Sequence, residues 1–249
     1  MVTGPGVGRS PATGRADGRR AGRVGLVVAF LILMAAAAAA ALVDWVAVGT
    51  GRRRLEYAAK PAVVAALATA AAVLPLDRTD LVDRRWWFVA ALACCLVGDV
   101  LLMVPKNLFV PGLGAFLVGH ALFVGGLLQP PSPLGVPPFS FSPLGLGVAA
   151  LAVVAGEAVP ATVLFRSLLG RGPRRLIPAV AVYMGAIATM VVLALNVGVG
   201  AAAAGAVLFL VSDSVLAWNR FVRPVPSGPV AVHVTYHLAQ GLLVLSLLH

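Results

Sequence analysis

Residues 86–104 read WWFVAALACCLVGDVLLMV, and Asp99 is the one charged residue among them. An α-helix rises 1.5 Å per residue, so a helix of this length crosses the hydrocarbon core of a bilayer, which is about 30 Å thick. A second apolar stretch, residues 199–218, carries Asp213 at a similar position. These two stretches predict transmembrane helices that each hold a buried carboxyl group, and such groups usually face a cavity and have a function there.

The whole chain has the composition of a membrane protein. Of its 249 residues, 60% are hydrophobic and 11% are charged, whereas soluble domains carry about 25% charged residues. Apolar stretches long enough to cross a bilayer recur along the chain. They cover residues 24–43, 58–74, 86–104, 110–128, 144–165, 176–195, 199–218 and 229–248. The sequence therefore predicts an all-α, polytopic membrane protein with a bundle of about eight transmembrane helices.

The predicted domain organisation is a tail followed by one transmembrane domain. Residues 1–23 are rich in Gly, Arg, Pro and Ser and show no apolar periodicity, which predicts a disordered tail. Residues 24–249 are predicted to form the eight-helix domain. The first apolar stretch follows a run of arginines, as in a signal peptide, but it is longer than a signal core, so we expect a retained helix.

The net charge of +10 has a membrane explanation. Most arginines lie near the ends of predicted helices and in the tail, where anionic lipids and membrane insertion favour them. We therefore expect the lipid bilayer as a partner, and no nucleic acid. Only Lys60 and Lys106 are lysines, and Ala and Gly are abundant. That composition is typical of a GC-rich bacterium and predicts a location in the bacterial plasma membrane. The oligomeric state does not follow from the sequence.

The polar residues of the predicted spans are expected to meet in one half of the bilayer. Asp99 and Asp213 each lie about 13 residues into an odd-numbered helix, so both approach the same face of the membrane. Even-numbered helices return from that face. Lys60 begins the second helix and Tyr236 lies early in the eighth, so both are expected at the depth of the aspartates. Further residues at related depths are His237, near Tyr236, and Glu157 in the fifth helix.

Short motifs follow one another in order from the second predicted helix to the eighth. They are Lys60-Pro61, GDVLLM at 98–103, Phe109, Phe116, Gly119-His120, Tyr183, Met190, GAVLFLVSD at 205–213, Thr235-Tyr236 and Gln240. This ordered set, which covers about 190 residues, resembles the YhhN family of eight-helix membrane proteins, whose animal members are lysoplasmalogenases. Phe123 stands where the family often has tyrosine, and His237 where an aromatic residue is common. The N-terminal tail lies outside the resemblance.

The resemblance implies hydrolysis of the vinyl ether bond of a lysophospholipid, without a cofactor, to a fatty aldehyde and a glycerophospho-headgroup. Vinyl ethers are hydrolysed by protonation at carbon, after which water captures the oxocarbenium ion. This requires a proton donor and a group that orients water, as with the two carboxyl groups of a glycosidase. Burial favours the protonated form of a carboxyl group, so we expect Asp99 and Asp213 to divide these catalytic roles, in an order that the sequence does not reveal. The expected supporting or substrate-binding residues are Lys60, His120, Tyr183, Ser212, Tyr236 and Gln240.

Other interpretations of the same residues remain open. Intramembrane acids also fix helix register, Lys60 can be an interfacial anchor, and His120 can be an interhelical hydrogen-bonding residue. A zinc hydrolase is disfavoured, because no zinc-motif spacing supports a site built from His120, His237, Asp99 and Asp213. His233 and His237 are four residues apart, but the acid of a zinc motif does not follow them. A proton-coupled transporter would use the same carboxylates, although its polar residues are expected in both leaflets. A lipid-binding protein without turnover is the third alternative.

Overall fold

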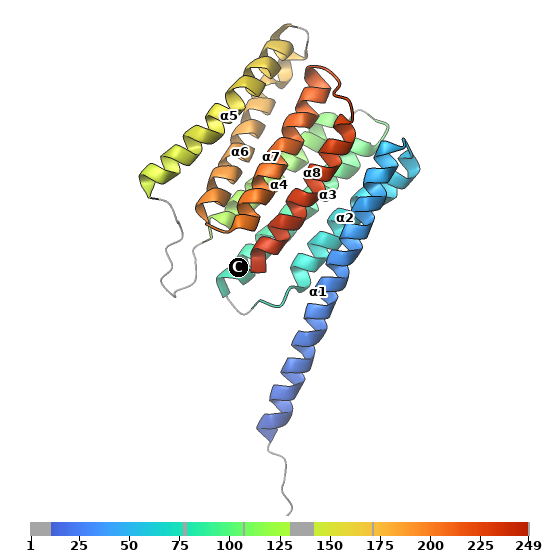
Figure 1. Ribbon diagram of the computed structural model, residues 1–249, viewed down its shortest axis with the longest axis vertical. Helices are drawn as coiled ribbons and strands as arrows, with labels where there is room; N and C mark the ends of the chain where they lie inside the picture. The colour runs from blue at the N-terminus through green and yellow to red at the C-terminus, as the bar shows by residue number, and fades with distance from the viewer. Residues whose placement is uncertain (1–10, 77–78, 107, 130–141, 171, 249) are drawn as a thin grey trace, which may run out of the picture.

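The computed structural model describes residues 11–76, 79–106, 108–129, 142–170 and 172–248, and they are mostly helical (Figure 1). The long helices are α1 (Pro11–Gly49), α2 (Arg53–Val73), α3 (Thr79–Met103), α4 (Phe109–Leu127), α5 (Pro143–Gly170), α6 (Ile177–Asn196), α7 (Gly200–Phe221) and α8 (Gly228–Leu245), with 3₁₀ turns η1 (Arg174–Leu176) and η2 (Ser246–Leu248). Within these residues, eight helices are long and apolar enough to cross a membrane. The predicted all-α polytopic fold and its eight spans are confirmed.

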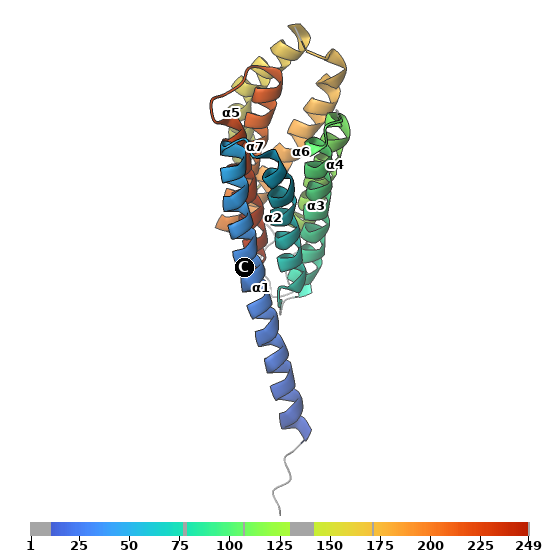
Figure 2. The same cartoon turned by 90° about the vertical axis from the view of Figure 1, so that its right-hand side faces the viewer.

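The helices form two layers. Helices α1, α8, α7 and α5 lie in one layer, and α2, α3, α4 and α6 lie in the other (Figures 1 and 2). The closest pairs are α3 with α4, α1 with α2, and α7 with α8, which short loops connect. Helices α2, α3, α7 and α8 meet in the middle of the bundle, so the polar residues of four helices are brought together there.

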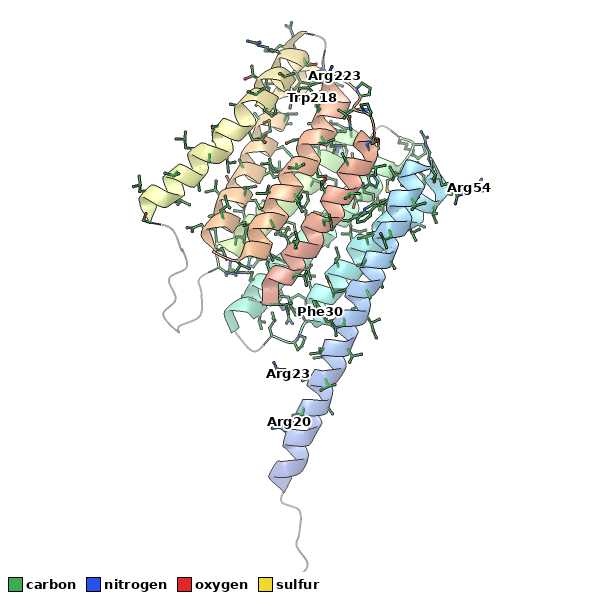
Figure 3. All side chains as sticks on the ribbon, in the orientation of Figure 1. Arg20, Arg23, Phe30, Arg54, Trp218 and Arg223 are labelled. Carbon is green, nitrogen blue, oxygen red and sulfur yellow. The ribbon has the colours of Figure 1, made fainter. Side chains whose placement is uncertain are left out.

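The connections from odd- to even-numbered helices all lie at one end of the bundle, which we call the basic end. It carries Arg52, Arg53, Arg54, Lys106, Arg174, Arg175, Arg220 and Arg223. Figure 3 labels Arg54 and Arg223 there, and shows Arg20 and Arg23 far away near the start of α1. Asp99 and Asp213 lie in the half of the bundle nearest the basic end, because they belong to the C-terminal halves of α3 and α7.

Helix α1 is longer than its apolar stretch. It begins at Pro11, so residues 11–23 are helical where the sequence predicts a disordered tail. Proline suits the first turn of a helix, and alanine and arginine are strong helix formers, so the transmembrane helix propagates outward through these residues. Figure 2 shows this part of α1 extending beyond the other helices. Residues 1–10 lie outside the described residues.

Small residues allow α7 and α8 to pack closely. A Cβ atom on the buried Gly205 of α7 would lie 2.9 Å from the carbonyl oxygen of Ala239 and 3.0 Å from the side chain of Leu243. Such close approach is typical of helix contacts in membranes. The neighbouring Phe209 and Ser212 then reach the interior at the level of the site.

The substitution Gly205→Ala is expected to lower the free energy of unfolding by about 1–3 kcal/mol, because the added methyl group pushes α7 away from the backbone of α8. The measurement is chemical denaturation of the purified protein in detergent. Gly185→Ala in α6 is the control: nothing lies within 4 Å of its added Cβ, so a stabilisation of about 0.5–1 kcal/mol is expected there. Equal effects of the two substitutions would contradict the close α7–α8 contact.

Candidate active site

Asp99 is fully buried in α3, and each of its carboxyl oxygens has a polar partner. Lys60 Nζ of α2 lies 2.9 Å from Oδ1, and the hydroxyl of Tyr236 on α8 donates to Oδ2 at 2.7 Å. Lys60 Nζ also lies 5.5 Å from the centre of the Tyr236 ring, within the range of a cation–π interaction. An ammonium and a hydroxyl thus replace the lost hydration of the carboxylate, which is what a buried ion pair requires.

Asp213 of α7 faces a different set of partners, on α4 and α6. The hydroxyl of Tyr183 donates to its Oδ2 at 2.6 Å, and His120 Nε2 lies 3.6 Å from the same oxygen. His120 Nδ1 lies 2.7 Å from the carbonyl oxygen of Phe116, and since a carbonyl only accepts, Nδ1 carries a hydrogen. Nε2 is therefore the ring nitrogen that faces Asp213, at a distance beyond a direct hydrogen bond.

Aromatic rings hold these partners in place. Phe209, one turn before Asp213 on α7, is fully buried. Its ring packs edge-on against His120 at 4.7 Å and against Tyr236 at 5.4 Å between ring centres. His120 in turn packs against Tyr183. Edge-to-face contacts of this kind restrict ring rotation, so the hydroxyls and the imidazole keep a defined direction toward the carboxyl groups.

Both carboxyl groups line one polar cavity with a volume of about 460 Å³. One face of α2 forms a wall, with Arg53, Glu56, Tyr57 and Lys60 at the i, i+3, i+4 and i+7 positions that share a helix face. Arg53 begins α2 at the basic end and Lys60 lies two turns deeper, beside Asp99. The polar cavity therefore extends from Arg53 at the basic end to both aspartates.

A second, apolar cavity of about 70 Å³ adjoins the first. It lies between α4, α5, α6 and α7, and its walls include Leu113, Leu164 and Ile187. Four residues line both cavities: Leu102, Phe116, Asp213 and Leu216. Asp213 thus lies where a polar space meets an apolar one. Glu157 of α5 also lines the apolar cavity, away from Lys60 and Asp99.

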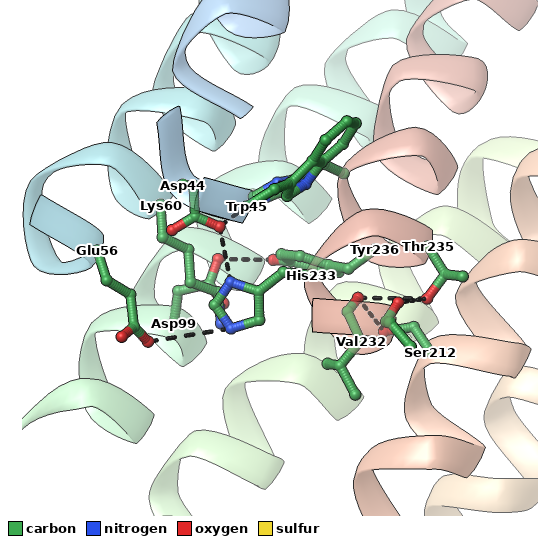
Figure 4. Close-up of polar contacts among 12 residues, drawn as sticks. Asp44, Trp45, Glu56, Lys60, Asp99, Ser212, Val232, His233, Thr235 and Tyr236 are labelled. Carbon is green, nitrogen blue, oxygen red and sulfur yellow. Dashed lines mark hydrogen bonds and ion pairs between the residues drawn. The ribbon is translucent and has the colours of Figure 1, made fainter. Parts of the chain in front are cut away.

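A further polar cluster, which the sequence does not predict, joins α1, α2 and α8 (Figure 4). Asp44 of α1 is fully buried, and its Oδ2 lies 2.6 Å from His233 Nδ1. His233 Nε2 lies 4.0 Å from Glu56 Oε1. In the sequence, Asp44 comes directly after the first apolar stretch, so it looks like a charged residue at the end of a transmembrane helix and not like a buried one. The sequence contains one indication of this cluster: His233 and His237 lie four residues apart on one face of α8, and polar side chains inside a membrane need polar partners.

Of the remaining predicted residues, Ser212 also lines the polar cavity. Ser212 donates to the carbonyl oxygen of Val232 at 3.0 Å and so joins α7 to α8. Gln240 is fully buried beside Tyr236 and Cys95. His237 accepts a hydrogen bond of 3.1 Å from Trp45 Nε1 instead of facing the two aspartates. In the part of the chain that the structure describes, no group of three or more His, Cys, Asp or Glu residues has the arrangement of a metal site.

Lys60 and Tyr236, which were expected at the depth of Asp99, contact it. The contacts of Asp213 with Tyr183 and His120 were not expected as a pairing. The bundle and the two adjoining cavities define a multi-pass membrane protein with an internal, amphipathic site. The model of the YhhN family matches residues 55–247. The chain belongs to the YhhN family. Helix α1, including Asp44, lies before the matched residues.

Several relatives carry the name lysoplasmalogenase. The chain is 37% identical over 158 residues to lysoplasmalogenase TMEM86B of Homo sapiens, which covers 64% of this chain and 62% of the human protein. It is 34% identical over 198 residues to a lysoplasmalogenase of Mycobacterium bovis, covering 78% of this chain and 70% of that protein. The matched part thus spans less than two thirds of the human relative's length. No solved structure matches the chain.

Proposed function

We propose that this protein is a membrane-embedded hydrolase that cleaves the vinyl ether bond of a lysophospholipid, as the names of its relatives suggest. One observation carries the proposal: Asp99 and Asp213 line the same polar cavity, and Asp213 also lines the adjoining apolar cavity. A vinyl ether lysolipid also has a polar part and an apolar part, and its reactive bond lies between the polar headgroup and the apolar chain. By the same proposal, the protein works in the plasma membrane of a bacterium.

The substrate is placed by the chemistry of the two cavities. The glycerophospho-headgroup occupies the polar cavity, where Arg53 and Lys60 supply positive charge. The hydrocarbon chain passes Asp213 into the apolar cavity and continues between the helices into the lipid, because α5 leaves most of its surface exposed to the bilayer. The vinyl ether bond then lies at the junction of the cavities, within reach of both carboxyl groups.

Asp213 is the proposed acid. Its partners are a hydroxyl and an imidazole, whereas Asp99 has an ammonium at 2.9 Å. A protonated Asp213 transfers its proton to the outer carbon of the vinyl ether, and the double bond becomes an oxocarbenium ion. General acid catalysis of this kind contributes about 10²–10⁴-fold to a rate. The Tyr183 hydroxyl holds the carboxyl group for this transfer, and His120 Nε2 lies 3.6 Å from the same oxygen.

Asp99 has the complementary role. Lys60 and Tyr236 keep it as a carboxylate, and a negative charge beside the cavity stabilises the developing oxocarbenium ion. The same carboxylate orients the water molecule that attacks this ion. Attack gives a hemiacetal, which breaks down to the fatty aldehyde and the glycerophospho-headgroup.

The test is release of fatty aldehyde by the purified protein in nanodiscs. The substrate is a vinyl ether lysolipid, and the control is the lysolipid with a saturated ether bond at the same position. The saturated ether has no double bond to protonate, so aldehyde is expected from the vinyl ether alone. Absence of aldehyde from both lipids overturns the proposal. Proton-driven uptake into proteoliposomes without cleavage would instead identify a transporter.

A further inference from the structure

The buried Asp44–His233 pair lies next to the proposed site, on the wall of the same polar cavity. His233 and Glu56 both line this cavity, together with Asp99 and Asp213. Asp44 lies behind His233, fully buried on α1, with Oδ2 at 2.6 Å from Nδ1. Figure 4 shows His233 between Asp44 and Glu56, close to Lys60 and Asp99. The pair thus connects α1, which lies outside the family match, to the space that the substrate is proposed to occupy.

The geometry defines which nitrogen of His233 is available for chemistry. The Asp44 carboxylate only accepts hydrogen bonds, so the contact of 2.6 Å places a hydrogen on Nδ1. Nε2 then carries the free lone pair. It points toward Glu56 Oε1, 4.0 Å away, which is beyond a hydrogen bond and belongs to the cavity wall. A buried carboxylate behind an imidazole is the arrangement by which the aspartate of a catalytic triad orients its histidine. Here the second nitrogen faces the wall of the polar cavity at Glu56.

We propose that His233 is a further catalytic residue, which accepts a proton from the attacking water, and that Asp44 is the positioning residue behind it. This inference rests on the proposed vinyl ether hydrolysis. Asp99 is less suited to accept that proton, because its two oxygens are already engaged by Lys60 and Tyr236. In this proposal the two residues act on the same water molecule. Asp99 orients it, and His233 Nε2 removes its proton.

The protons balance over one cycle. Asp213 gives its proton to the vinyl carbon, and the oxocarbenium ion forms. The oxygen of water bonds to the cationic carbon while one O–H bond breaks and its proton moves to His233 Nε2. The hemiacetal then loses its hydroxyl proton to the Asp213 carboxylate. Its bond to the glycerol oxygen breaks, and that oxygen takes the proton from His233. Aldehyde and alcohol leave, and both residues return to their starting states.

The first experiment is His233→Ala assayed with and without added imidazole. Loss of a general base is expected to lower kcat by about 10²-fold with little change in KM. Because the polar cavity is also lined by the exposed Arg53, we expect imidazole to enter the space left by the side chain and to restore at least a tenth of the wild-type kcat. A purely structural role of His233 would not allow rescue by a small base.

His237→Ala is the matched control. His237 is one turn further along α8, accepts a hydrogen bond from Trp45, and has its Nδ1 3.8 Å from Asp44 Oδ2. It lines an apolar cavity between α1, α2 and α8 instead of the polar one, so it shares the neighbour Asp44 but not the proposed reaction space. We expect His237→Ala to keep most of its activity and to show no response to imidazole. Wild-type kcat in His233→Ala, or equal responses of the two variants to imidazole, overturns the inference. If wild-type protein releases no aldehyde, it is the proposed function that has failed.

Two further variants keep the test decisive if His233→Ala does not fold. His233→Gln retains a donor to Asp44 but has no basic nitrogen, so a folded protein with a kcat about 10²-fold below wild type is expected. Asp44→Asn keeps the shape of the side chain but stops holding the imidazole in one tautomer. It is expected to lower kcat and to leave KM unchanged. A folded His233→Gln protein with wild-type kcat would exclude His233 as the base.

Discussion

Asparagine in place of Asp213 is expected to lower the kcat for aldehyde release by about 10³-fold, because the amide cannot give a proton to the vinyl carbon. The change preserves size, and the Tyr183 hydroxyl, now 2.6 Å from Oδ2 of the aspartate, can still donate to the amide oxygen. The fold is therefore expected to survive. The measurement is aldehyde release under saturating vinyl ether lysolipid, after size-exclusion chromatography and circular dichroism show an intact bundle.

Asp83→Asn is the control for this substitution. Asp83 is on α3, near the end opposite the basic end, and its side chain is exposed. Removing its charge is expected to leave kcat unchanged. If folded Asp213→Asn retains full turnover, Asp213 is not the acid, and the assignment of roles to the two aspartates is wrong.

The substitution Lys60→Met is expected to lower the free energy of unfolding by about 3–5 kcal/mol, because it breaks a buried ion pair. Methionine matches the length of lysine but removes the ammonium 2.9 Å from Asp99 Oδ1. Asp99 is fully buried, so its charge would be left with the Tyr236 hydroxyl as its partner. Denaturation in detergent measures the loss, and aldehyde release is expected to fall with it, since the site would lose its ordered carboxylate.

A double substitution separates the ion pair from simple packing. Lys60→Met combined with Asp99→Asn removes both charges, and the amide oxygen can still accept from Tyr236. Replacing a whole buried pair is often nearly neutral for stability, so the double variant is expected to recover most of the stability lost in Lys60→Met. It is expected to remain inactive. Additive losses from the two substitutions would show that Lys60 and Asp99 do not interact.

The spans and the depth of the polar groups were predictable because both depend on local properties of the chain. Apolar length defines a transmembrane helix, and the alternation of helix direction determines at which end of the bundle Asp99, Asp213, Lys60 and Tyr236 lie. The helical extension of residues 11–23 was not predicted, since composition alone suggested disorder there. The helix continues because an existing helix is extended more easily than a new one is started.

Which side chains of the site contact one another could not be predicted, because the depth of a residue in the membrane does not specify the direction in which its helix points it. The sequence does not reveal that Lys60 meets Asp99 and that Tyr183 and His120 meet Asp213. Ser212 and Gln240 were expected to serve the site. Ser212 lines the polar cavity and donates to backbone, and Gln240 is buried beside Tyr236. A turn of a helix by one residue moves a side chain by about 100° around the axis, and packing against neighbours decides that turn.

By itself, the sequence determined an eight-helix membrane protein with two carboxyl groups in the same half of the bilayer, because hydrophobic length and helix direction are set along the chain. The tertiary structure alone decided that an ammonium holds Asp99 while Asp213 stands between a polar and an apolar cavity. It also decided that Asp44 of α1 lies behind His233 of α8, since residues 189 positions apart meet only when the helices pack.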